Sequence, residues 1–416
     1  MKRYLALGVV WLGCALGWML LGATLLVRSG ETSSQLVNEV HALWGPPLDQ
    51  GAPAASYLET RTREERTTLH AANGRPYEST VTKTEEVSFP LSLESTQARV
   101  VLALEHRQKG LLWFPTYAVD FQARYLVRND TPVARTARLS FPLPARDAIY
   151  DGFEVRDGDG RPIAASVEGA AALWTVPLPP GATHTFSVRY RTRGTSSWTY
   201  RPASSGGAVV KDFALELWTS TAGIDFAPGS ISPSAAGPEG RGWHGRWEFK
   251  SLVASAPISV ELPQKLNPGP LAARITFFAP VSLLFYFFVV VLLAERRGHQ
   301  LHPLSWFLIG CAFFADHLLF AYLADHLPLW AALGLSSGAS VALVVTYAQW
   351  LVGWRFAVRE MGLAQLVYLV GFSLTFMLRG FTGLSIAVGA VLTLALMMQV
   401  TGRRLRSDVP RAEWVR

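Results

Sequence analysis

The chain has 416 residues, of which 50% are hydrophobic and only 17% are charged. Soluble globular proteins carry about 25% charged residues, so this composition excludes an ordinary soluble protein and indicates a membrane protein with a large polar region. The net charge is +7. Both cysteines, Cys14 and Cys311, lie in apolar runs, which argues against a disulfide or a zinc site.

Six apolar stretches are candidates for membrane-spanning helices, each of which needs about 20 largely apolar residues. They are residues 4–27, 275–294, 304–323, 329–352, 363–378 and 384–400. The first is longer than the apolar core of a cleaved signal peptide, which has about 7–15 residues. We therefore expect an uncleaved anchor, followed much later in the chain by five further spans.

Basic residues predict how these spans are oriented, because Lys and Arg concentrate on the cytoplasmic flanks of membrane helices. Clusters stand before the first span and after the second, fourth and sixth: Lys2 and Arg3; Arg296 and Arg297; Arg355 and Arg359; Arg403, Arg404, Arg406, Arg411 and Arg416. With six spans all four clusters fall on one side, which predicts that both termini are cytoplasmic. Arg379 is the exception, and the last two spans could instead form a re-entrant hairpin.

The long region between the first two spans shows the two-residue periodicity of half-buried strands. In residues 119–127, Val119, Phe121 and Tyr125 alternate with polar residues. Turn sequences rich in Gly and Pro separate several such runs, which favours an antiparallel β sandwich, or two of them. Residues 31–48 are more helix-like and predict a stalk.

The expected organisation is therefore an α-helical membrane protein with a large all-β domain inserted between its first two helices. We expect an anchor at 1–27, an extracytoplasmic β domain at 28–270, a five-helix bundle at 271–402 and a basic cytoplasmic tail at 403–416.

The β domain shows no pattern typical of catalysis or of metal binding. Its histidines have no metal-ligand spacing, and neither a nucleophile elbow nor a phosphate-binding loop is present. Asp157 and Asp159 fit a tight turn better than a calcium loop, since Pro162 interrupts the pattern. Six tryptophans are expected to pack in the core and at its rim: Trp113, Trp174, Trp198, Trp218, Trp243 and Trp247. We predict no cofactor, no metal and no nucleic-acid partner.

Two Asp-His pairs, Asp316-His317 and Asp325-His326, occur in the third apolar span and just after it. Nine positions place the pairs on opposite faces of a helix, so one helix cannot gather all four residues around one ion. Asp325-His326 is expected at a wet helix end. Asp316 lies within the hydrocarbon, where a charged side chain costs about 2.5–3.5 kcal/mol.

Asp316, His317 and Arg379 thus form the candidate intramembrane polar site. The favoured interpretation is one internal polar bond that orients helices, and the alternative is a proton-sensitive or ligand-sensitive site. The next span carries Gly334 and Gly338, whose spacing lets helix backbones approach closely. Their partner could lie in the same chain or in another copy, so an oligomer is left open.

The sequence resembles the CreD family of bacterial inner-membrane proteins. The resemblance is carried by His302, Pro303, Gly310, Asp325 and His326, and by the order of one span, an exported domain and a bundle. Where family members usually carry aromatic or aliphatic residues, this chain has Asp316-His317. The resemblance implies a role in cell-envelope integrity or stress, without an established enzymatic activity.

We therefore predict a non-enzymatic inner-membrane protein that sits in the lipid bilayer and presents its β domain to an unknown envelope protein or ligand. One alternative is an ion or small-molecule transporter that uses Asp316 and His317. Another is an intramembrane hydrolase that would combine Ser337 or Ser340 with His317.

Overall fold

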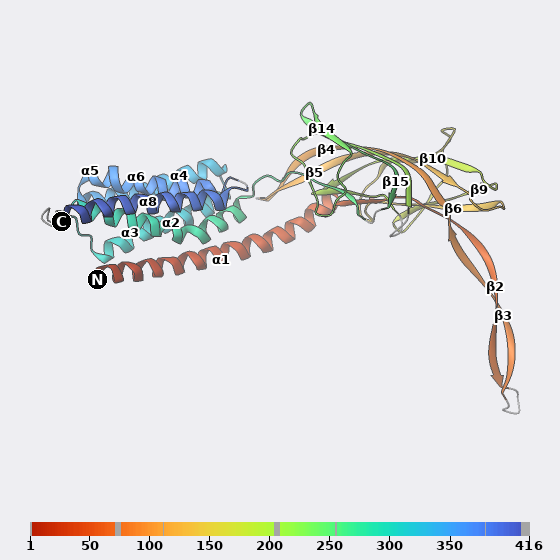
Figure 1. The fold of residues 1–416 in the computed structure, drawn as a ribbon, viewed down its shortest axis with the longest axis horizontal. Coiled ribbons are helices and arrows are strands. Elements are labelled where there is room, and N and C mark those ends of the chain that lie inside the picture. The colour runs from red at the N-terminus through yellow and green to blue at the C-terminus, as the bar shows by residue number, and fades with distance from the viewer. Residues whose placement is uncertain are drawn as a thin grey trace, which may run out of the picture. The chain divides into compact units, whose positions relative to one another are not determined.

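The computed structural model describes residues 2–70, 76–110, 112–203, 209–253, 256–378 and 380–408. The chain divides into two compact units, visible in Figure 1 as a group of helices and a group of strands. The helical unit comprises Met1–Leu36, Gly110–Leu112 and Leu266–Arg416, and the β unit comprises Val37–Lys109 and Trp113–Lys265. The domain boundaries expected from the sequence, with a β domain at 28–270, stay a prediction.

The first helix, α1, runs without a break from Lys2 to Trp44. It joins the predicted anchor and the predicted stalk in one element, and its segment Tyr4–Arg28 is apolar enough to cross a membrane. Gly45 ends the helix with a positive φ of 93°, a conformation that favours glycine.

Six helices among the described residues are long and apolar enough to span a membrane, as predicted. The first three that follow the β unit are regular α-helices: α2 (Pro268–Arg296), α3 (Pro303–Leu323) and α4 (Leu329–Val352). Proline occupies the first turn of α2 and α3, where its missing N–H costs nothing. The last span, α8, covers Thr382–Asp408, so the first residues of the predicted tail are helical.

The fifth span differs from the prediction, because it begins at Trp354 and ends at Thr375. It is built from five short pieces: α5 (Trp354–Phe356), η1 (Ala357–Gly362), α6 (Leu363–Gln365), η2 (Leu366–Gly371) and α7 (Phe372–Thr375). The elements η1 and η2 are π-helical. The charged residues near its start suggested a loop, but Glu360 forms an ion pair with Arg297 at 2.9 Å and stays within the helix.

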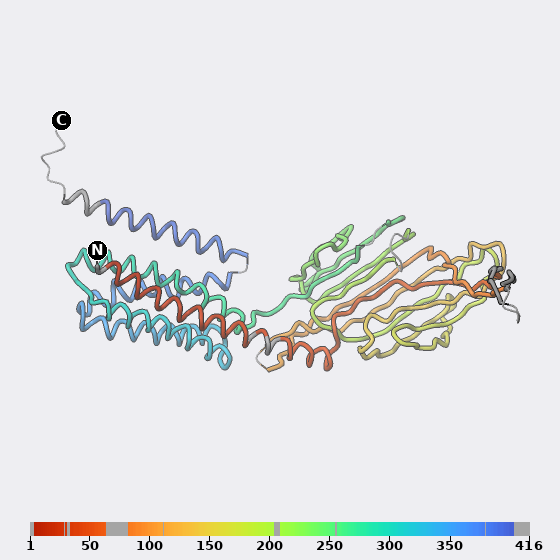
Figure 2. Tube along the Cα trace, turned by 90° about the horizontal axis from the view of Figure 1, so that it is seen from below, coloured from red at the N-terminus to blue at the C-terminus, as the bar shows by residue number. Residues whose placement is uncertain are grey.

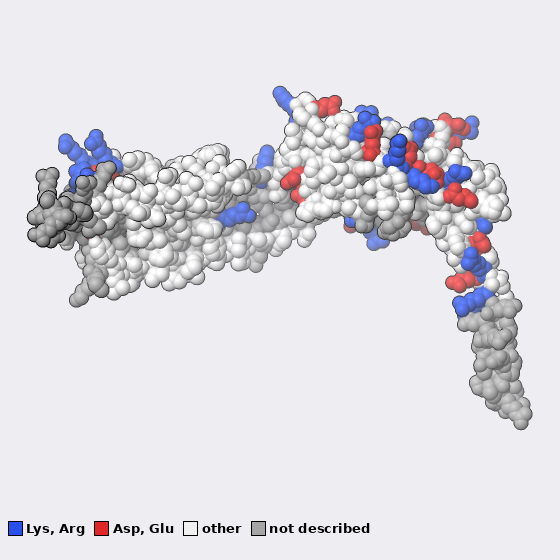
Figure 3. All heavy atoms as spheres, viewed as in Figure 1, with Lys and Arg blue, Asp and Glu red and all other residues white. Residues whose placement is uncertain are grey.

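Contacts within the helical unit show which helix ends lie together. The Tyr4 hydroxyl donates to Glu295 at 2.5 Å, which joins the start of α1 to the end of α2, and the Arg297–Glu360 pair adds the fifth span. Figure 2 shows that α8 finishes at the same end of this unit. In Figure 3 basic residues gather at that end, a further basic patch lies towards the other end of the helices, and the surface between them is uncharged.

The described residues of the β unit form sixteen strands in three sheets. The strands are β1 (Leu48–Gly51), β2 (Ala54–His70), β3 (Pro76–Pro90), β4 (Ser92–Lys109), β5 (Leu112–Arg128), β6 (Arg135–Pro142), β7 (Asp151–Asp157), β8 (Ser166–Glu168), β9 (Ala171–Leu178), β10 (Thr183–Thr195), β11 (Ser197–Arg201), β12 (Val209–Thr219), β13 (Asp225–Phe226), β14 (Ala235–Glu239), β15 (Gly242–Val253) and β16 (Ile258–Glu261). The sheet orders are β14-β15-β12-β4-β5-β10-β7, β3-β2-β6-β9-β8 and β1-β11-β16-β13.

One hydrophobic core holds the three sheets together, with buried residues from all of them. The alternation predicted for 119–127 is confirmed, because Val119, Phe121 and Tyr125 are buried. Trp198 and Trp247 are fully buried core residues, whereas Trp243 packs at the rim. The expectation of a purely antiparallel sandwich was wrong, since β4 pairs with β12 and β1 pairs with β11 in parallel. Long connections bring these distant strands together, and sequence periodicity carries no information on strand direction.

Candidate functional site: a buried polar cluster between the helices

Asp316 and His317 lie in the middle of α3 and point into the helical unit. Their side chains are 2% and 1% exposed. The apolar stripe of α3 places them between Phe313 and Phe320, which are also buried. Because such polar groups are expensive in a membrane interior, they are expected to face protein partners rather than lipid.

The Asp316 carboxylate is held by α4. The Ser337 hydroxyl donates to Asp316 Oδ1 at 3.1 Å, and His317 Nδ1 lies 3.7 Å from Asp316 Oδ2. A closer partner of His317 is the Phe313 carbonyl oxygen, 2.9 Å from Nδ1. A carbonyl only accepts, so Nδ1 carries a proton and the second nitrogen, Nε2, is left for another group.

The polar cluster continues to the fifth span through Ser340 and Gln365. Ser340 donates to the carbonyl oxygen of Ala312 at 2.7 Å, and Gln365 Nε2 donates to the Ser340 hydroxyl at 2.9 Å. Gln365 is fully buried and ends α6, the short α-helical piece between η1 and η2. π-Helical turns are frequent at functional sites. Sequence reasoning missed Gln365, although one amide in an apolar span is a visible signal.

Several buried polar atoms around this cluster have no hydrogen-bond partner among the described residues: Trp18 Nε1, Ser282 Oγ, Tyr286 Oη, His317 Nε2 and Gln365 Oε1. The Trp18 ring meets the His317 ring edge-on, 5.8 Å between centroids. The ring of Tyr286 in α2 packs against the ring of Phe313 in α3, with 4.7 Å between the ring centroids. Ser282 precedes Tyr286 by one turn and His317 follows Phe313 by one turn, so in these antiparallel helices Ser282 and His317 lie at one level. The cluster therefore gathers polar groups from α1, α2, α3, α4 and α6.

The other predicted partner of Asp316, Arg379, lies outside the described residues, so that pairing stays a prediction. Asp325 follows the end of α3 and forms an ion pair with Arg28 of α1 at 3.2 Å. His326 is exposed in the same turn. The second Asp-His pair thus lies at a helix end, and its acid links α3 to α1.

The remaining family-motif residues shape the start of α3. His302 caps the helix, since its Nδ1 accepts a hydrogen bond from the Leu304 amide at 3.2 Å, and Pro303 follows in the first turn. A Cβ atom at Gly310 would lie 2.7 Å from Cys14 Sγ. Only glycine allows α3 to approach α1 so closely.

Gly334 and Gly338 do not form a packing seam within this chain. Both are exposed, and a Cβ atom added at either would meet nothing within 4 Å in the described part of the chain. The face of α4 that packs inward carries Ser336, Ser337 and Ser340 instead. Of the two partners left open by the sequence, an approach between two copies therefore stays a prediction.

The arrangement does not form the hydrolase site considered above, because the hydroxyls of Ser337 and Ser340 bond to Asp316 and Ala312 rather than to His317. No group of three or more His, Cys, Asp or Glu side chains able to hold a metal occurs among the described residues. What the described contacts show is a set of hydrogen bonds that joins α3, α4 and α6 through buried polar side chains.

Residues 242–406 match the family described as Inner membrane protein CreD. Over these residues, which make up less than half of the chain, the sequence is similar to the CreD family. The match confirms an inner-membrane protein. The matched residues include Asp316, Ser337 and Gln365 of the polar cluster, and they also include the motif residues His302 and Gly310. No curated protein matches the chain.

Solved structures resemble the chain only distantly. A candidate nutrient binding protein from Legionella pneumophila is 12% identical, with a TM-score of 0.33, and the likeness covers 59% of this chain and 96% of that one. An M1 zinc metallopeptidase from Deinococcus radiodurans is 9% identical, with a TM-score of 0.23 over 67% of this chain and 94% of the other. These values are too low to support an argument about function.

Proposed function

We propose that this protein is a non-enzymatic inner-membrane protein that supports envelope integrity or the response to envelope stress. It does so by presenting its β unit, outside the cytoplasm, to another envelope component. One observation carries the proposal: the β unit is a compact body with its own core, and the chain enters it from one apolar helix and leaves it into another. A domain tied to a membrane at both ends is suited to offering surface rather than to diffusing.

The proposed topology places both termini in the cytoplasm and the β unit on the other side. Two observations support it: the start of α1 and the end of α2 meet through Tyr4 and Glu295, and basic residues gather at that end of the helical unit. Reporter fusions after Trp174 and after Arg297 test the topology. Activity of a cytoplasmic reporter at Trp174 would contradict the proposal.

Photocrosslinking in living cells tests the partner. A photoreactive residue at Val133 or Val167, which are exposed apolar positions of the β unit, should give a reproducible protein adduct. The same residue at Leu394, an exposed position of α8, is the matched control and should give lipid adducts. If the β-unit positions yield the same products as Leu394, the proposed presentation of surface is wrong.

A second candidate function is a proton-sensitive or transporting site at Asp316 and His317. It is favoured by the buried polar cluster, in which His317 Nε2 and Gln365 Oε1 have no partner among the described residues. Proton or ion flux into liposomes tests this function. Asp316→Asn should abolish any flux and Asp325→Asn, at the helix end, should retain it; flux that survives Asp316→Asn excludes the site.

A further inference from the structure

The outer face of the seven-stranded sheet contains a half-open cavity of about 530 Å³. On three neighbouring strands the residues that point away from the core form two rows: Ala103, Ala118 and Arg193, and Val101, Asp120 and Arg191. The register of β5 and β10 pairs Ala118 with Arg193 and Asp120 with Arg191. The two alanines leave a hollow between longer side chains.

The end of α1 forms one wall of this cavity, through Leu43 and Trp44. Three contacts hold that wall in place. The Thr195 hydroxyl donates to the Gly45 carbonyl oxygen at 3.2 Å, the Thr195 amide donates to the Pro46 carbonyl oxygen at 3.3 Å, and the Arg107 guanidinium lies 5.5 Å from the centroid of the Trp44 ring. The wall is therefore preformed, as expected of a small-molecule site.

The opposite lip is the loop that presents Ile149, whose side chain is 86% exposed. The loop is fixed, because the Thr192 hydroxyl donates to the Ile149 carbonyl oxygen at 2.7 Å. The Tyr150 hydroxyl also donates to the carbonyl oxygen of Ala145 at 2.6 Å. Ile149 is thus a large apolar side chain that a fixed loop exposes to water. It lies beside the exposed Leu43 and Val101, and exposed apolar surface of this kind indicates a binding site.

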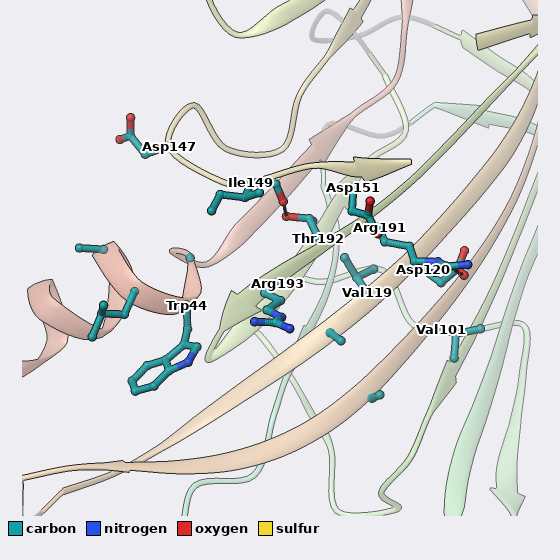
Figure 4. Close-up of a pocket in the computed structure, with 15 residues that line it drawn as sticks. Trp44, Val101, Val119, Asp120, Asp147, Ile149, Asp151, Arg191, Thr192 and Arg193 are labelled. Carbon is teal, nitrogen blue, oxygen red and sulfur yellow. Dashed lines mark hydrogen bonds and ion pairs between the residues drawn. The ribbon is translucent and has the colours of Figure 1, made fainter. Parts of the chain in front are cut away.

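Charge divides the cavity into two ends. Arg191 lies beside Asp120 at 3.4 Å and opposite Asp151 in the strand register, so its charge is balanced. Arg193 has no carboxylate within ion-pair distance among the described residues. In Figure 4, Arg193 and Trp44 lie towards the end of α1, and Arg191 and Asp120 lie farther along the strands. A free guanidinium at an apolar hollow is suited to a carboxylate or phosphate.

We propose that this cavity binds an amphipathic anion consisting of one acyl chain and a carboxylate or phosphate head. The chain would lie over Ala103, Ala118 and Val101 against Ile149 and Leu43, and the head would bond to Arg193 beside Trp44. The helix that forms the wall is the continuation of a candidate membrane span, Tyr4–Arg28, so lipid is a local source of such molecules. The binding site does not depend on whether the β unit also contacts an envelope protein.

The test uses the full-length protein in nanodiscs of phosphatidylcholine, which has no net charge. Binding of dansyl-labelled undecanoic acid is followed by fluorescence, and palmitate, lysophosphatidylglycerol and hexadecanol compete with it. Displacement by palmitate alone identifies a free fatty acid as the source, and displacement by lysophosphatidylglycerol identifies a lipid phosphate. Hexadecanol has no anionic head, and the proposal is overturned if it competes as well as the two anions.

Variants separate the cavity from partition of the probe into lipid. Arg193→Gln should weaken binding of the anion about tenfold, the usual size of a charge-assisted hydrogen bond. Arg124→Gln, on the same outer face of β5 but away from the cavity, is the matched control and should bind as the unchanged protein does. Ala118→Phe should fill the hollow and abolish saturable binding. Equal binding by Arg193→Gln and Arg124→Gln, with melting temperatures unchanged, overturns the proposal.

Discussion

Replacing Asp316 by Asn tests what the buried carboxylate supplies to the helical unit. The amide keeps an oxygen that accepts from Ser337, now 3.1 Å from Asp316 Oδ1, and it removes a group whose charge costs about 2.5–3.5 kcal/mol within a membrane. Hydrogen bonds between membrane helices average about 0.6 kcal/mol. If the interhelical bond is the contribution of Asp316, Asp316→Asn should therefore be as stable as the unchanged protein or more stable, by up to about 3 kcal/mol.

The measurement is equilibrium unfolding by dodecyl sulfate in bicelles, followed by tryptophan fluorescence. Asp316→Ala removes the acceptor as well, and it should be less stable than Asp316→Asn by about 0.6–1.7 kcal/mol. With Ser337→Ala already in place, that difference should disappear. The reasoning is refuted if Asp316→Asn loses more than about 1 kcal/mol, because the negative charge itself, paired with a protonated His317, would then be stabilising.

Three further changes test other contacts. Gly310→Leu forces a side chain against Cys14 and should cost about 1–3 kcal/mol in the same unfolding assay, whereas Gly334→Leu, which meets open space, should change stability by less than about 0.5 kcal/mol. Tyr190→Phe removes the donor to Gln50 Oε1, 2.6 Å away in the core of the β unit, and should lower its stability by about 1–3 kcal/mol in thermal melts. Burial lowers the pKa of His184 below its ordinary 6.5, so the unfolded chain binds the proton first and stability should fall as pH drops through that value; melts of His184→Gln should show a weaker fall, and identical pH profiles would contradict this assignment.

The spans were predictable because hydropathy acts along the chain, and the fourth was placed at Leu329–Val352 without error. The fifth was placed too late because Arg355 and Arg359 indicated a flank outside the membrane, whereas both residues lie within the helical elements that begin at Trp354. Strand alternation identified the buried side of β5, but no local pattern reveals that β4 pairs with β12 in parallel. Pairing depends on the free energy of packing the whole sheet, which single segments do not encode.

The buried polar residues were also predictable only where a local pattern in the sequence reveals them. Asp316 was recognisable as a buried acid because an acid in a membrane span is costly. Its partner Ser337 was noted only as a nucleophile, and Gln365 was missed, because the bonds among them depend on how α3, α4 and α6 pack. The cavity of the β unit had no signal at all, since Ala103 and Ala118 are ordinary strand residues until their strands are placed beside Arg193.

The residues that carry the family resemblance mostly fix one helix against another. Gly310 lets α1 approach α3 near Cys14. Asp325 forms an ion pair with Arg28, which lies much farther along α1. Two contacts so far apart on one helix define both its position and its rotation. The same helix continues unbroken to Trp44. The motif residues therefore constrain α1, the element from which the chain enters the β unit.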